Sequence, residues 1–146
     1  MVKYKVHIDD LPVVQVPGRE VRNAVSREVS GSEQMTMQIV DVLPGAVSKP
    51  GHTHTDCEEI IFVHSGEGDI MIDDKVHHMK PGDIVFLPRG VRHMTRNPGK
   101  EKMRLFCAFS SCDLKAGMCF HQEMEYPVKD YSKKIVLKLG PSYNSD

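Results

Sequence analysis

The fold of this chain is decided by residues 51–66, which read GHTHTDCEEIIFVHSG. His52 and His54 are two positions apart, so on an extended strand both imidazoles point to the same face. Glu59 opens the apolar run that follows, and we expect its carboxylate to reach the same point from the neighbouring strand. Two imidazoles and a carboxylate suit iron, manganese, nickel, zinc or copper. The stretch therefore predicts half of a metal site.

The other half is predicted within residues 82–97, GDIVFLPRGVRHMTRN. An apolar strand over residues 84–87 has the composition of a buried strand and ends in a Pro-Arg-Gly turn. His93 then begins the returning strand and is the expected fourth ligand. Gly82 and Gly90 are expected to allow tight-turn dihedrals and close backbone approach.

These two stretches resemble the two sequence motifs of the cupin superfamily. The fixed positions of the motifs are occupied by His52, His54, Glu59 and Gly66, and by Gly82, Pro88, Gly90, His93 and Asn97. One departure is that six residues separate Gly45 from His52, where the first motif has five. Fifteen residues lie between the motifs, which leaves room for one hairpin. We expect Asn97 to tie a neighbouring loop by hydrogen bonds.

The resemblance implies an all-β fold, a double-stranded antiparallel β-barrel of the jelly-roll type. Residues 1–146 are expected to form one domain of the small, single-domain (monocupin) type, with the barrel core over about 35–110 and a flanking segment over 111–146. The metal would be held inside the barrel by His52, His54, Glu59 and His93. Because this fold hosts many enzymes as well as non-catalytic binding proteins, it names no reaction.

Four protein ligands leave two open positions on a six-coordinate ion, enough for a bidentate, oxygen-rich substrate. Tetrahedral zinc would already be saturated by four ligands, so a catalytic site favours manganese, iron, nickel or cobalt, with zinc still possible. We therefore expect a metal-dependent enzyme of dioxygenase or isomerase/lyase type acting on a small molecule. Two alternatives stay open: a metal-containing module that binds or senses a small ligand without turnover, and a purely structural metal.

Five residues are candidates for contact with the substrate. Arg19 and Arg22 are expected to reach over the barrel mouth and bind a carboxylate or phosphate. Gln38 is a donor to the substrate if it faces inward, and an outward polar residue otherwise. His121 and Tyr126 follow the last barrel strand, in or just after an irregular stretch placed to lie over the open end of the barrel.

The strand that begins at Glu59 is apolar on both faces. Alternation places Ile61 on the metal side and Ile60 and Phe62 on the outer side. The outer face must then be covered by the N-terminal segment, by another sheet or by a second subunit, and we expect a homodimer. The expected apolar interior comprises Ile61, Val63, Ile84, Phe86, Leu105 and Phe109.

Composition limits the partners and the compartment. The 146 residues include 19 basic and 20 acidic side chains, so the formal net charge is −1 and neither nucleic acid nor a membrane is expected as a partner. The N-terminal residues lack the apolar core of a signal peptide, so a cytoplasmic protein is expected. Cys57, Cys107, Cys112 and Cys119 are expected to be reduced. A last short strand is predicted over residues 134–139.

Overall fold

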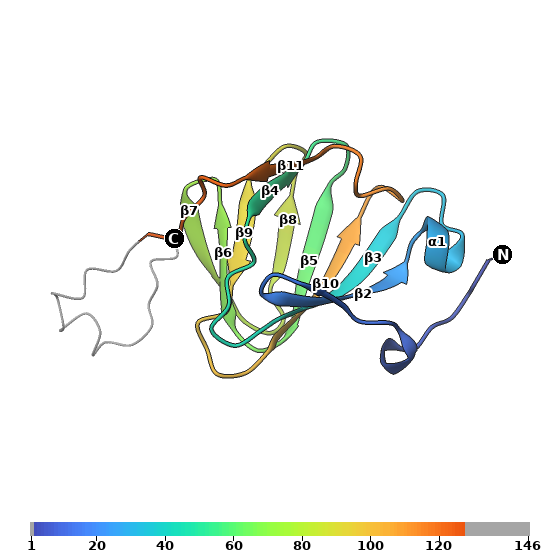
Figure 1. Ribbon diagram of the computed structural model, residues 1–146, viewed down its shortest axis with the longest axis horizontal. Helices are drawn as coiled ribbons and strands as arrows, with labels where there is room; N and C mark the ends of the chain where they lie inside the picture. The colour runs from blue at the N-terminus through green and yellow to red at the C-terminus, as the bar shows by residue number, and fades with distance from the viewer. Residues whose placement is uncertain (1, 128–146) are drawn as a thin grey trace, which may run out of the picture.

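Two antiparallel β-sheets face one another in a computed structural model that describes residues 2–127 (Figure 1). The strand predicted over 134–139 lies outside the described residues. The six-stranded sheet runs, in spatial order, β1 Val14–Val16, β2 Arg19–Val25, β3 Thr36–Val42, β10 Met103–Phe109, β5 Glu59–Ser65 and β8 Ile84–Leu87. The five-stranded sheet runs β11 Met118–His121, β4 Gly51–His54, β9 His93–Arg96, β6 Gly68–Ile72 and β7 Lys75–Met79. The expected all-β, jelly-roll-like architecture is confirmed.

The core lies between the two sheets and is filled from alternate positions of the strands. β10 alternates buried and partly buried residues along its whole length, as its sequence predicts, and β5 alternates buried and outward-facing positions. Ile61, Val63, Leu105 and Phe109 are buried, which confirms their place in the expected interior. Burying each of these side chains stabilises the fold by about 2 kcal/mol relative to leaving it in water.

The expected inward positions of β8 are wrong. Ile84 and Phe86 are 70% and 55% exposed, whereas Leu87 is buried and Val85 packs against the core. The cause is the register with β5, because Glu59 pairs with Leu87 and therefore places Leu87 on the inner face. An all-apolar strand carries no alternation from which the inner face could be chosen.

The N-terminal part holds more regular structure than its polar sequence indicates. The polar composition of residues 18–33 is typical of loop and edge strand, but β2 pairs with β1 on one side and β3 on the other. A 3₁₀ turn covers Ile8–Asp10. A short helix α1, Arg27–Ser30, follows β2, and its first turn is capped by Ser26, whose side chain accepts a hydrogen bond from the Val29 amide.

Two turn glycines precede β8 and β9, and Asn97 follows β9. Gly82 and Gly90 have φ of +93° and +80°, so the expected tight turns are confirmed. The expectation of a close backbone approach at these glycines is wrong, because no atom would lie within 4 Å of a Cβ at either position. Asn97 is fully buried, donates hydrogen bonds to the carbonyls of Val42 and Glu101, and accepts one from the Gly99 amide. Its expected structural role is confirmed.

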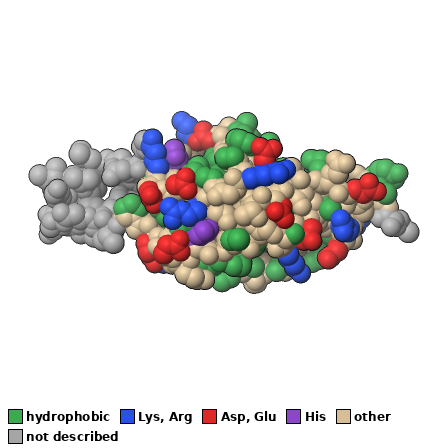
Figure 2. Space-filling model, turned by 90° about the horizontal axis from the view of Figure 1, so that it is seen from above, with side chains coloured by type: hydrophobic (Ala, Val, Ile, Leu, Met, Phe, Trp, Pro, Cys, Tyr) green, Lys and Arg blue, Asp and Glu red, His purple; other side chains and the backbone are tan. Residues whose placement is uncertain are grey.

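Acidic and basic side chains lie interspersed over the face shown in Figure 2. This mixture agrees with the near-zero formal charge of the sequence. Within residues 2–127, the structure contains no helix long and apolar enough to cross a bilayer.

Candidate metal centre

Three imidazoles meet on the inner side of the five-stranded sheet. β4 carries His52 and His54, and β9 carries His93 directly opposite His52 in the ladder. One ring nitrogen of each histidine lies within 4.8 Å of the other two. Period-two alternation on β4 and the pairing of β4 with β9 are therefore sufficient to gather the cluster.

Glu59 approaches the cluster from the opposite layer. It begins β5 of the six-stranded sheet, so the expected approach from a neighbouring strand is wrong, and the carboxylate crosses the space between the sheets instead. Its Oε1 lies 3.6 Å from His54 Nε2 and 3.3 Å from His93 Nε2. Two donors bound at about 2.1 Å to one ion are separated by about this much.

Several donor atoms of this cluster are buried without a hydrogen-bond partner: both ring nitrogens of His54, Oε1 of Glu59 and Nε2 of His93. Leaving polar atoms buried and unpaired is costly unless another group satisfies them. His93 uses its other nitrogen, Nδ1, to donate to the carbonyl of Val91 at 3.1 Å, which leaves the Nε2 lone pair facing Glu59. A metal ligand is typically oriented in this way. The residues present therefore fit a divalent ion.

Burial keeps two of the imidazoles in the neutral form that a ligand needs. Burial, together with the neighbouring His93, His54 and Arg19, lowers the pKa of His52 to about 2, although a hydrogen bond to the Pro50 backbone opposes this. The pKa of His54 is also lowered by burial, against the opposing influence of Glu59. Both rings therefore keep a free lone pair at neutral pH.

The imidazoles open into a cavity of about 480 Å³ between the two sheets. This volume lies in the range of small-molecule sites. The inner wall holds the histidines, Glu59 and Arg19, and the outer wall is largely apolar, with Val14 and Phe120 among its residues. The arrangement places polar donors deep in the cavity and apolar surface toward its mouth.

The structure separates the five candidate substrate residues into two groups. Arg19 and Gln38 line the cavity, and Gln38 donates from Nε2 to Asn23 Oδ1 at 2.8 Å. Arg22 does not line it, because its guanidinium pairs with the buried Asp41 at 3.1 Å.

His121 and Tyr126 also lie away from the cavity walls. In β11 the alternate residues Met118 and Phe120 line the cavity, so the side chain of His121 lies on the other face of the strand. There it contacts Thr53 and Glu123. Tyr126 donates to the backbone carbonyls of Asp69 and Met94.

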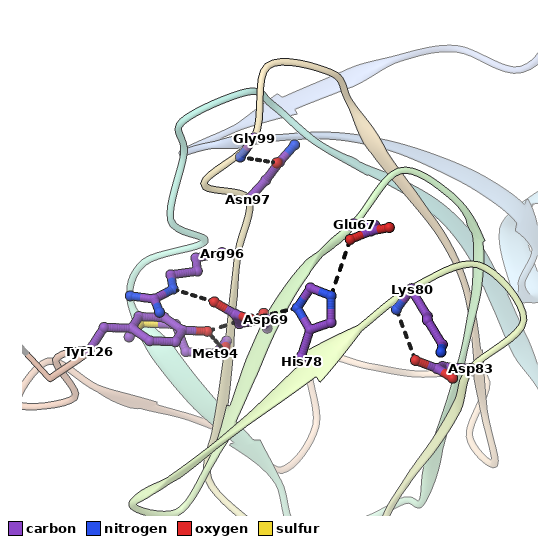
Figure 3. A network of polar contacts seen from close by, with 10 residues as sticks. All are labelled: Glu67, Asp69, His78, Lys80, Asp83, Met94, Arg96, Asn97, Gly99 and Tyr126. Atoms are coloured by element: carbon purple, nitrogen blue, oxygen red, sulfur yellow. Dashed lines mark hydrogen bonds and ion pairs between the residues drawn. The ribbon is translucent and has the colours of Figure 1, made fainter. Parts of the chain in front are cut away.

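Tyr126 belongs to a polar network outside the barrel interior (Figure 3). The Arg96 guanidinium lies 4.1 Å from the centre of the Tyr126 ring and donates to Asp69, which also contacts His78. The network attaches the segment after β11 to strands β6 and β9.

Cys107 is a cavity residue that the sequence did not single out. It lies on the predicted inward face of β10, and its alternation with Leu105 and Phe109 was the available signal. Burial, the Glu59 carboxylate and a hydrogen bond to that carboxylate raise the pKa of the Cys107 thiol well above its usual range. The thiol therefore stays protonated beside the candidate ligand.

Comparison with known proteins agrees with this geometry. Residues 38–109 match the family model of the cupin domain. The chain is 32% identical over 101 residues to Protein SchB of Streptomyces halstedii, covering 68% of this chain and 72% of that protein. Germin-like proteins of Arabidopsis thaliana also match, but the chain spans less than half of their length.

Two solved structures show the same fold at low sequence identity. An oxalate decarboxylase of Lactobacillus farciminis superimposes with a TM-score of 0.71 and 18% identity, over 82% of this chain but only 36% of that chain. The nucleoside dehydratase Pac13 superimposes with a TM-score of 0.71 and 12% identity, over 85% of this chain and 95% of that chain.

Proposed function

The chain belongs to the cupin superfamily, and from this premise we propose that it is a metal-dependent enzyme acting on an oxygen-rich small molecule. The observation that supports this proposal is the set of buried donor atoms without partners that faces a cavity of about 480 Å³. Relatives of the fold bind small oxygen-rich molecules, since the oxalate decarboxylase was solved as a formate complex and a Pac13 variant with uridine.

His52, His54, His93 and Glu59 would hold the ion. A bound divalent ion supplies Lewis-acid chemistry and a template that orients substrate oxygens. The chain contributes the orientation of His93 through Val91, the single negative charge of Glu59, and an apolar surround that limits the access of water. The four-donor set favours manganese, iron, nickel or cobalt, with zinc possible.

The cavity offers no separate carboxylate base. Glu59 is its only acidic residue among those described, and Lys49, at the rim, is paired with Glu125 at 2.7 Å. Besides the ligands themselves and a substrate group, the protonated Cys107 thiol is the group in the cavity that could take part in proton transfer. The lack of a further carboxylate among the described cavity residues favours the second candidate, a module that binds or senses a small ligand without turnover.

Metal analysis and chelation test the proposal. We expect one transition-metal ion per purified chain, and we expect chelation to lower the melting temperature while the far-ultraviolet circular dichroism spectrum remains that of a β-protein, because the core does not depend on the ion. A thermal-shift screen of 2-hydroxy acids, diketones and enediols, followed by turnover assays of those that bind, separates enzyme from binding module. Cooperative unfolding of the chelated protein would instead assign the metal a structural role.

We propose that the outer face of the six-stranded sheet is the interface of a homodimer. Ile60 pairs across the ladder with Phe86, and Phe62 pairs with Ile84, so four exposed apolar side chains form one patch. A patch of this kind on a sheet face commonly marks a protein interface. Two copies related by a two-fold axis would cover it with the same residues, and a formal charge of −1 opposes their approach only weakly.

If this patch is the dimer interface, the protein should have the mass of two chains in solution. Light scattering of the wild type at micromolar concentration should give twice 16.5 kDa, and the double variant Ile84→Lys/Phe86→Lys should give 16.5 kDa because four charges cannot be buried together at the interface. Tyr4→Lys changes a 95% exposed aromatic residue outside the patch and should leave the dimer intact. A wild-type mass of 16.5 kDa would contradict the proposal.

A further inference from the structure

One positive charge inside the cavity takes no part in the candidate metal site. Arg19 begins β2 directly after Gly18, whose φ of +75° turns the chain between β1 and β2. The Arg19 side chain lines the cavity, and its Nε is buried without a hydrogen-bond partner. Burial lowers the pKa of the guanidinium against the opposing influence of the Glu59 carboxylate. Arginine nevertheless remains charged in proteins.

Other arginines of the same sheet are paired. Arg22 and Arg104 both bind the buried Asp41, at 3.1 Å and 2.7 Å respectively. Asp41 lies on β3 one position from Val42, which is the ladder partner of Arg19, so alternation places the Arg19 side chain on the opposite, inner face. Arg19 is thus separated from that carboxylate by the sheet itself.

The charge inside the cavity is unbalanced. With a divalent ion in place, the guanidinium and the ion oppose the single carboxylate of Glu59, which leaves an excess of two positive charges. Uncompensated charge is costly to bury, and an arginine fork whose Nε is free matches the two oxygens of a carboxylate. Val14, Val16 and Phe120 line the same cavity, with Val14 47% and Phe120 60% exposed at its mouth.

We propose that Arg19 is a specificity-determining residue that binds the carboxylate of the substrate, and that the substrate is an organic acid whose apolar part lies against the mouth. This inference rests on the proposed function for its metal, but its guanidinium site exists whether or not an ion is bound. The carboxylate of the acid would bind between Arg19 and the histidines, and its apolar group would contact Val14, Val16 and Phe120.

Binding of matched probes tests the inference. Calorimetry of the metal-free and the metal-loaded protein would compare mandelate, a 2-hydroxy acid with a phenyl group, with mandelamide, which has a neutral amide in place of the carboxylate. The wild type should bind mandelate at least about tenfold more tightly in both forms, because a paired charge-assisted bond is lost in the amide. In the metal-free protein, Arg19→Gln should remove this preference, and Arg19→Lys should retain part of it because lysine keeps the charge without the two parallel N–H donors of the guanidinium.

Two controls separate a binding role from a structural one. Arg22→Gln, which changes the arginine already paired with Asp41, should leave the preference for mandelate unchanged. Arg19→Gln should bind the same amount of metal and have an equal or higher melting temperature without ligand, because it removes a partly buried charge whose Nε has no hydrogen-bond partner.

Two results would overturn the inference: an unchanged preference in Arg19→Gln, or a melting temperature several degrees lower in that variant with binding retained. If the histidines bind no metal but the preference depends on Arg19, the metal-dependent function fails while this inference stands.

Discussion

Replacing His93 with alanine is expected to weaken metal binding by about a hundredfold or more, so that the purified variant carries little metal. His93 Nε2 lies 3.3 Å from Glu59 Oε1, and the ring faces His52 across the ladder, so its loss opens one side of the donor set. His52→Ala and His54→Ala should have effects of the same size because the donors act together. Elemental analysis and competition with a chromogenic chelator measure these changes.

Histidines outside the cluster provide the matched controls. His77 lies on β7 opposite Ile70, and His78 contacts Glu67 and Asp69 instead of the cavity. His77→Ala and His78→Ala should therefore retain the wild-type metal content. Loss of the metal in His77→Ala together with its retention in His93→Ala would refute the assignment of the ligands.

Asn97→Ala should lower the free energy of unfolding by about 3 kcal/mol, or the melting temperature by about 10 °C. The Asn97 side chain makes three hydrogen bonds to backbone groups, and alanine would leave the Val42 carbonyl and the Gly99 amide without this partner. Urea unfolding followed by circular dichroism measures the change.

Asn97→Asp separates the contributions of the two ends of the amide. Aspartate keeps the oxygen that accepts from Gly99 but loses both donors, and it places a carboxylate beside two carbonyl oxygens. This variant should be at least as destabilised as Asn97→Ala. A change below about 0.5 kcal/mol in both variants would show that the loop does not depend on these bonds.

The histidine cluster was predictable because it needs little tertiary information. The period of two on β4 brings His52 and His54 to one face whatever the rest of the fold does, and the spacing of the two sequence motifs indicated His93. Which layer would supply Glu59 was not predictable, because a chain that leaves β4 can return beside it or cross to the facing sheet.

Which residues of β8 face inward, and which residues line the cavity, depends on the register between strands, and this register cannot be read from the sequence. Residues 84–87 are apolar on both faces, so only the pairing of Leu87 with Glu59 decides that Ile84 and Phe86 face outward. Arg19 and Arg22 are three positions apart on β2, so alternation separates them, and only the pairing with β3 decides that Arg22 is the one on the face of Asp41. Long-range pairing of this kind leaves no local periodicity to find.

The division of the four donors between two layers has a consequence for metal selectivity. An ion held by β4 and β9 on one side and by Glu59 of β5 on the other would act as a cross-link between the sheets, and the separation of the sheets at this point would set the distance between Glu59 and the histidines. That separation is set by side chains such as Ile61 and Leu105, none of which is a ligand. Core side chains that donate no atom to the ion would thus influence which ionic radius the site accepts, and a change of metal preference would not require the exchange of a donor.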